Sequence, residues 1–305
     1  MNLGPIGSAV QPLRFVFLVT CVIALTSGAG ATNPPGLEEV LARAGRYVQQ
    51  FERDFALVIS DEDYRQEESF DSERMVDPND ALRPYRVGRR LDVHAETLFL
   101  WLAQDRAWMS VRSPLKVGSE FVADSKDRLE RAVRDESPGQ LTRLRQIARE
   151  SVRFNLGSYR DNNTPTLALQ FLDPEVRPRF AFTLASRERV NGVDAVRVTF
   201  RERQRPTVMQ SDGEDLFSTG SLWIATNDAV VLRTLLTWQV PARRDRAGSN
   251  GSVLVEYRRD PTLAMWVPAK MEEQLRQVGG INDALHCTAT YSRFRRLDTS
   301  VRIVP

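Results

Sequence analysis

The sequence predicts an α+β fold, in which a long curved antiparallel sheet, a half-barrel, carries about three helices packed on its concave face. Helical periodicity is confined to residues 37–55 and 126–157. From Thr164 onward, alternating segments recur at roughly ten-residue spacing with short turns, which favours antiparallel hairpins over parallel crossover units. A sheet of that many strands curls and does not stay flat. Together these observations predict the half-barrel.

The N-terminal segment has the pattern of an export signal. Arg14 is the only charged residue before Glu38, and it precedes the apolar run "FVFLVTCVIAL". Ala29 and Ala31 then have the spacing of a signal-peptidase site. The run is too short to span a bilayer comfortably. We therefore expect a cleaved signal and a periplasmic or secreted protein.

The predicted organisation is a signal peptide over residues 1–31, a linker over residues 32–36 and a single domain over residues 37–305. Two alternatives stay open at the N-terminus. The apolar run could remain as an uncleaved membrane anchor, or Cys21 could be lipidated, although Thr is a poor residue before a lipidated cysteine. Beyond the N-terminus we expect at most peripheral membrane contact.

The first half of the domain mixes helices and strands. Residues 37–55 form an amphipathic helix with its acidic residues early. A strand that becomes polar follows over residues 56–69, then a loop over residues 70–84. Residues 89–103 form a long strand, and residues 106–113 continue it or pair back. Two helices come next, the second with Ser137-Pro138 at its start and Gly157 at its end.

The second half is predicted to be extended from Thr164 to its end. Residues 166–172 read as a strand that ends at Asp173-Pro174, and Asn191-Gly192 is a strong hairpin signal between two alternating segments. The stretch "GSLWIATNDAVVLRTLLTWQVP" from Gly220 forms a further hairpin. Three more strands follow over residues 252–297.

The sequence argues against most enzyme chemistries. It has only two histidines, and His286 lies next to Cys287, so in a strand their side chains should point to opposite faces. No G-x-S-x-G, H-E-x-x-H, P-loop or G-x-G-x-x-G pattern occurs. We assign no catalytic residue, metal or cofactor and expect a protein that is not an enzyme. Catalysis by dispersed carboxylates is left open as an alternative.

Charged segments are interpreted as solvated surface. The acidic run from Ser60 to Glu73 lacks the glycine of a calcium loop, so we read it as an exposed edge strand. Only three of the 42 basic residues are lysines, but the arginines are spread along the chain and accompanied by 40 acids. No nucleic-acid partner is therefore expected. Cys287 is expected to be a small buried side chain.

Apolar residues remain in excess of an obvious core. Curled antiparallel sheets often hold apolar ligands at their mouths. Candidate ligand-binding residues on the predicted strands are Leu100, Trp101, Phe171, Phe180, Phe182, Trp223, Leu236 and Trp238.

The order of these parts resembles the periplasmic lipoprotein-carrier superfamily, which includes the carrier LolA, its receptor LolB and the similarly shaped domain of the stress sensor RseB. A signal, an amphipathic helix from Leu37 to Phe55, a helical insertion from Lys126 to Leu156 and a long antiparallel series occur in that order. "GSLWIATNDAVVLRT" and "MWVPAKMEEQ" look like two strand regions of that group. Residues 66–86 and 203–218 are longer than that pattern.

Two functions follow as expectations. The first is a periplasmic protein that holds an acyl chain of a lipid or lipoprotein in an apolar half-barrel cavity. The alternative is an envelope sensor or scaffold with a self-filled core, which binds a partner protein or peptide through the sheet edge and the long loops.

Overall fold

The computed structural model describes residues 36–71, 88–135, 137–157, 164–211, 213–243, 247–278 and 282–297. The chain divides into two units, residues 1–34 and 35–305, and the fold below is that of the second. The predicted signal peptide, Cys21 and nearly all of the predicted loop over residues 70–84 lie outside the described residues.

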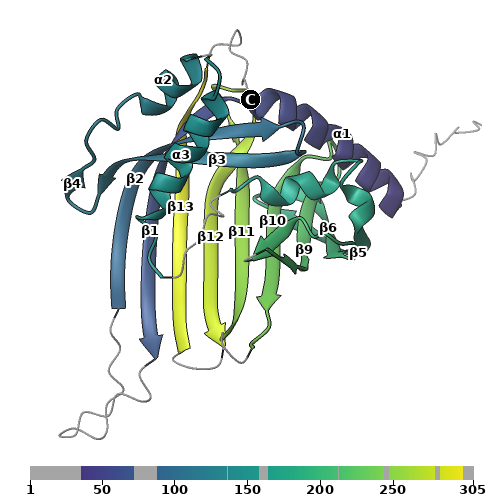
Figure 1. The fold of residues 1–305 in the computed structure, drawn as a ribbon. Coiled ribbons are helices and arrows are strands. Elements are labelled where there is room, and N and C mark those ends of the chain that lie inside the picture. Colours follow the sequence, from purple (N-terminus) through teal and green to yellow (C-terminus); the bar gives the residue numbers. More distant parts are fainter. Residues whose placement is uncertain are drawn as a thin grey trace, which may run out of the picture. The chain divides into compact units, whose positions relative to one another are not determined.

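An open antiparallel sheet of eleven strands forms the unit, in the order β4-β3-β2-β1-β13-β12-β11-β10-β9-β6-β5 (Figure 1). The strands are β1 (Val58–Asp71), β2 (Gly88–Leu102), β3 (Ala107–Val117), β4 (Glu120–Phe121), β5 (Phe180–Val190), β6 (Val193–Glu202), β9 (Ser218–Ala225), β10 (Val231–Val240), β11 (Gly248–Asp260), β12 (Met265–Val278) and β13 (Asn282–Arg296). A separate two-stranded sheet pairs β7 (Met209–Ser211) with β8 (Glu214–Leu216).

Among the described residues the helices are fewer than the strands, and α1 is the longest of them with 19 residues. They are α1 (Leu37–Phe55), α2 (Arg128–Arg134), α3 (Gln140–Val152) and the 3₁₀ helices η1 (Leu167–Leu172) and η2 (Arg177–Arg179). The predicted α+β class with a curved, open antiparallel sheet is confirmed.

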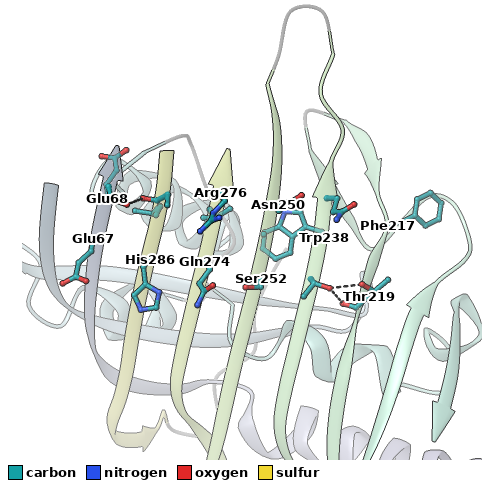
Figure 2. Close-up of a pocket in the computed structure, with 17 residues that line it drawn as sticks. Glu67, Glu68, Phe217, Thr219, Trp238, Asn250, Ser252, Gln274, Arg276 and His286 are labelled. Atoms are coloured by element: carbon teal, nitrogen blue, oxygen red, sulfur yellow. Dashed lines mark hydrogen bonds between the residues drawn. The ribbon is translucent and has the colours of Figure 1, made fainter. Parts of the chain in front are cut away.

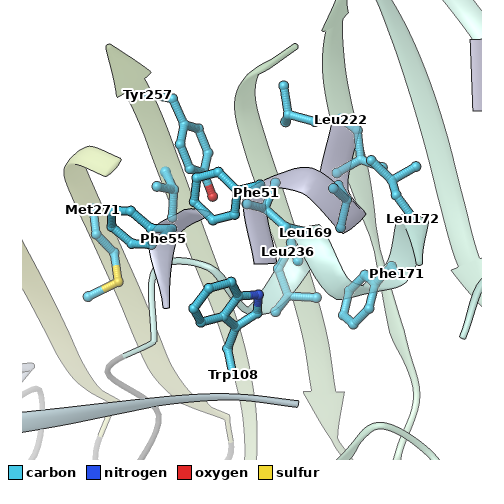
Figure 3. Close-up of a cluster of buried hydrophobic side chains, with 14 of the residues drawn as sticks. Phe51, Phe55, Trp108, Leu169, Phe171, Leu172, Leu222, Leu236, Tyr257 and Met271 are labelled. Carbon is cyan, nitrogen blue, oxygen red and sulfur yellow. The ribbon is translucent and has the colours of Figure 1, made fainter. Parts of the chain in front are cut away.

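α1 and η1 fill one face of the sheet, which we call the inner face. Phe51 and Phe55 of α1 are buried against the sheet, with ring centroids 5.6 Å from Trp108 and 4.8 Å from Phe99, respectively. Leu169 and Leu172 of η1 are fully buried in the same cluster (Figure 3). The helical stripe predicted over residues 37–55 therefore forms the centre of the core.

α2 and α3 pack on the opposite face, which we call the outer face, over β1, β2 and β3. Val58 pairs with Phe99 and contributes to the α1 cluster, whereas the next pair, Ile59 and Leu98, contacts the α2/α3 cluster. Because successive strand residues point to opposite faces, the two helical layers lie on opposite sides of these strands. β2 is apolar on both sides for this reason.

Three expectations about individual elements were wrong. The acidic run lies in β1, which pairs with β2 on one side and β13 on the other, so it is an interior strand with Glu62 and Glu68 buried. Residues 167–172 form the 3₁₀ helix η1, because an apolar run this short does not distinguish a strand from a buried turn of helix. α3 begins after Gly139, whose left-handed φ of 87° separates it from Ser137-Pro138.

Candidate functional site

The eight predicted ligand-binding residues do not share one surface. Leu100 contacts the α2/α3 cluster on the outer face. Trp223 pairs with Arg233 on that same face and belongs to a third cluster, where its Nε1 donates a hydrogen bond to Oε2 of Glu188 at 2.7 Å. The others belong to the inner-face cluster or pack against it: Trp101, Phe171, Phe180, Phe182, Leu236 and Trp238.

Within the inner-face group, packing is dense. Phe171 is fully buried, and its ring lies 4.5 Å from that of Phe180 in a stacked arrangement. Trp101 and Phe182 are only partly buried, at the margin of the cluster. The side chains of η1 thus occupy the space that an open half-barrel would offer.

One small apolar hollow remains between η1 and strands β10 and β11. Its volume is about 10 Å³, and of the predicted residues Leu236 and Trp238 line it. The remaining lining residues are Thr164, Pro165, Leu167, Ala168, Met209, Thr234, Val253 and Val255. This volume holds at most about one water molecule, and the walls are apolar apart from Thr164 and Thr234.

The wall of this hollow on the η1 side is held by one buried hydrogen bond. The Tyr257 hydroxyl donates to the carbonyl oxygen of Pro165 at 2.9 Å. Burial, reinforced by the nearby Tyr47, raises the pKa of Tyr257, so its hydroxyl stays protonated and keeps its role as donor. The other wall ends at Trp238, whose ring lies on Gly251 of the neighbouring strand.

Trp238 has room only because residue 251 is glycine. A Cβ at Gly251 would lie 2.2 Å from two atoms of the indole ring. The two residues are direct cross-strand partners, and Trp238 is half-buried. The indole therefore lies flat on the sheet at the edge of the hollow.

A buried acidic residue of α1 is coupled electrostatically to Asp173, the residue that follows η1. Glu52 is 5% exposed, and desolvation together with the negative charge of Asp173 raises its pKa to about 8. Arg106 partly offsets this, and it binds Asp173 through two contacts of 2.9 and 2.8 Å. One arginine thus faces two carboxyl groups, which favours a proton on Glu52 at neutral pH.

A large cavity among the described residues lies on the outer face of the sheet and is open to solvent. Its volume is about 980 Å³, and it runs across β1, β13, β12, β11 and β10 to the start of β9 (Figure 2). We call it the outer groove. Of the predicted ligand-binding residues only Trp238 lines it. The groove as a whole was not predicted, since its residues gather only when six strands are placed in register.

Cross-strand pairing arranges the groove residues in two rows on the outer face. The first row is Glu67, His286, Gln274, Ser252, Thr237 and Thr219, each paired with the next. The second row is Ser69, Ala284, Arg276, Asn250 and Gln239, with Phe217 just before β9. Residues between the rows, such as Leu275 and Leu285, face the core.

Neither metal binding nor membrane spanning has support in the part of the chain described. Among the described residues, no three His, Cys, Asp or Glu side chains are grouped in a way that could hold a metal ion. Within the same residues, no helix combines the length and apolarity required to cross a bilayer. Cys287 is fully buried and His286 is exposed, so the two neighbours do diverge as predicted.

No protein-family model and no curated protein matches the chain. Solved structures with a similar fold include an outer membrane lipoprotein-sorting protein domain from Vibrio parahaemolyticus, with 9% identity, 86% of this chain and 95% of that chain covered, and a TM-score of 0.37. A DUF1329 family protein from Desulfovibrio piger has 12% identity, coverage of 89% and 96%, and a TM-score of 0.36.

A third similar structure is a LolA superfamily protein from Nitrosomonas europaea, with 6% identity, coverage of 83% and 94%, and a TM-score of 0.28. At these identities and TM-scores the likeness concerns the fold and carries no inference about ligand or activity.

Proposed function

We propose that the protein is a non-enzymatic binding protein of the cell envelope that takes up an acyl chain of a lipid or lipoprotein at the hollow between η1 and strands β10 and β11. The supporting observation is the character of the hollow, whose walls are almost entirely apolar and include Leu236 and Trp238. An acyl chain needs no catalytic or charged group to bind, because each buried CH₂ contributes about 0.8 kcal/mol.

In the closed structure the ligand has to replace side chains of the η1 segment. η1 is a six-residue 3₁₀ helix, and runs of this kind are uncommon because their hydrogen-bond geometry is poor. Its apolar contacts with β10 and β11 are of the same kind that an acyl chain would make, so the exchange conserves buried apolar area. Displacement of Leu167 and Ala168 from the hollow is the step the proposal requires.

Extraction and mass spectrometry of protein purified from its native envelope test this proposal. Co-purified lipid is expected for the wild type and a several-fold lower yield for Ala168→Leu, whose larger side chain takes more than the space of the hollow and competes with a ligand there. Ala185→Leu makes the same change on the exposed part of β5 and serves as control. Equal lipid yields from both variants, or no lipid in any preparation, would contradict acyl-chain binding.

A second function is favoured by how completely the core is filled. The interior of the sheet is occupied by α1 and η1, and β5 is an edge strand of eleven residues with Leu184 43% exposed. A sensor or scaffold could add a partner strand at this edge. Trp238→Asp separates the two functions, because it should unfold a filled core but only abolish ligand binding at a cavity wall.

A further inference from the structure

The outer groove and the hollow involve opposite faces of the same strands, and Trp238 contributes to the lining of both. Its two rows project away from the core, and Glu67, Gln274 and His286 are exposed. Figure 2 shows Glu67, His286, Gln274 and Ser252 side by side across four strands. A cavity of about 980 Å³ is at the upper end of the range for ligand sites.

The chemistry of the rows is polar and balanced in charge. Hydroxyl and amide side chains are the most numerous in the two rows, whose charged residues are Glu67 and Arg276. Glu68 also lines the groove, and it forms an ion pair with Arg89. A groove for nucleic acid or an anionic polymer would need an excess of arginine or lysine. The hydroxyls and amides here both donate and accept hydrogen bonds, which matches a ligand whose groups do the same.

A peptide cannot bind in the outer groove by pairing its main chain with a strand. β1, β13, β12, β11, β10 and β9 each have a hydrogen-bonded neighbour on both sides, so no strand edge is available. Recognition rests on side chains alone. A ligand rich in hydroxyl groups and without net charge fits these constraints better than an extended polypeptide.

The groove is also rigid and has an aromatic side chain at one end. The hydroxyl groups of Thr219 and Thr237 are 2.8 Å apart and hydrogen-bonded, which fixes their positions on the sheet. Phe217 is 38% exposed at the end of the second row and offers a ring for stacking. Six strands at about 4.8 Å spacing give a row of roughly 24 Å, long enough for a chain of several sugar units.

We propose that the outer groove binds a neutral oligosaccharide, laid across β1 to β9, with the first row and Asn250 bonding its hydroxyl groups and Phe217 stacking on a sugar ring. The ligand needs no opening of the core, so this site operates whether or not the hollow takes up an acyl chain. Binding should depend little on ionic strength because the ligand carries no charge.

A glycan array followed by calorimetry on the full chain with maltohexaose, cellohexaose and N-acetylchitohexaose tests the proposal. At least one neutral oligosaccharide is expected to bind, and Gln274→Ala and Phe217→Ala should each weaken it by about 5- to 10-fold. Gln277→Ala, on the same strand but outside the groove, should leave the affinity unchanged.

Three outcomes would overturn it. The first is the absence of binding to every neutral glycan. The second is binding that Gln274→Ala and Phe217→Ala both leave intact. The third is a preference for acidic polysaccharides that disappears at high salt, which would assign the groove to an anionic ligand. Circular dichroism of each variant establishes that a lost signal reflects the groove and not unfolding.

Discussion

Arg112 and Glu62 form a two-pronged ion pair inside the sheet, with Nη2 2.5 Å from Oε1 and Nε 2.8 Å from Oε2. Their side chains are only 4% and 1% exposed. Burial alone would lower the pKa of Arg112, but the charge of Glu62 and its hydrogen bonds outweigh that effect and raise it. The guanidinium also lies 4.1 Å from the ring centroid of Tyr64.

Removal of one partner of this pair should be costly. Arg112→Met leaves the Glu62 carboxylate buried without its counter-ion, and we expect a loss of about 3–5 kcal/mol in the free energy of unfolding, measured with urea. The double variant with Glu62→Gln should recover much of it. Arg65→Met, which breaks the exposed pair with Asp92, is the control and should cost less than about 1 kcal/mol.

The raised pKa of Glu52 predicts a pH-dependent stability. The folded value is about 8 against an ordinary value of 4.5, so between these pH values the folded state holds a proton that the unfolded state has released. Stability contributed by this group therefore falls as pH rises from 4.5 to 8. Glu52→Gln should remove that slope in thermal unfolding followed across pH, and an unchanged slope would contradict the assignment.

A methyl group at position 251 should displace Trp238. The added Cβ of Gly251→Ala would lie 2.2 Å from the indole, so we expect altered tryptophan fluorescence and a loss of about 1–3 kcal/mol. In a Trp238→Ala background the Cβ of Gly251→Ala has room, so the additional loss of stability from Gly251→Ala should largely vanish. Purely additive effects would show that the two side chains do not compete for this space.

Gly220→Ala should be more damaging than Gly251→Ala. A Cβ at Gly220 would lie 1.9 Å from the backbone oxygen of Leu235 and 2.6 Å from Phe200, and a backbone atom cannot rotate away as an indole can. The free energies of unfolding of the two variants under identical conditions give the comparison. A smaller loss for Gly220→Ala would mean that β9 and β10 separate at low cost.

Local sequence patterns correctly predicted those elements whose conformation depends on residues close to them in the sequence. The amphipathic stripe of residues 37–55 became α1 with the same bounds. Asn191 and Gly192 adopt positive φ values of 49° and 82° between β5 and β6, as a tight hairpin requires. In both cases the information lies within a few residues of the element that it specifies.

Sites that depend on register could not be predicted. Leu100 and Trp223 look like cavity residues in the sequence, but the alternation of their strands turns them away from the inner face. Glu67 and Thr219 lie at opposite ends of the first row of the outer groove, with four strands between β1 and β9. No local sequence pattern encodes that arrangement. Polar residues at alternate positions near the strand ends were its only trace in the sequence.

The pairing of β1 with β13 affects how the molecule can be made. Val58 lies opposite Arg296, so the first and last strands meet in the middle of the sheet. A ribosome must synthesise everything from β1 to β13 before this central seam can close. Until then β1 and β12 are both exposed as edges, and an interrupted product would leave two half-sheets liable to pair with other molecules.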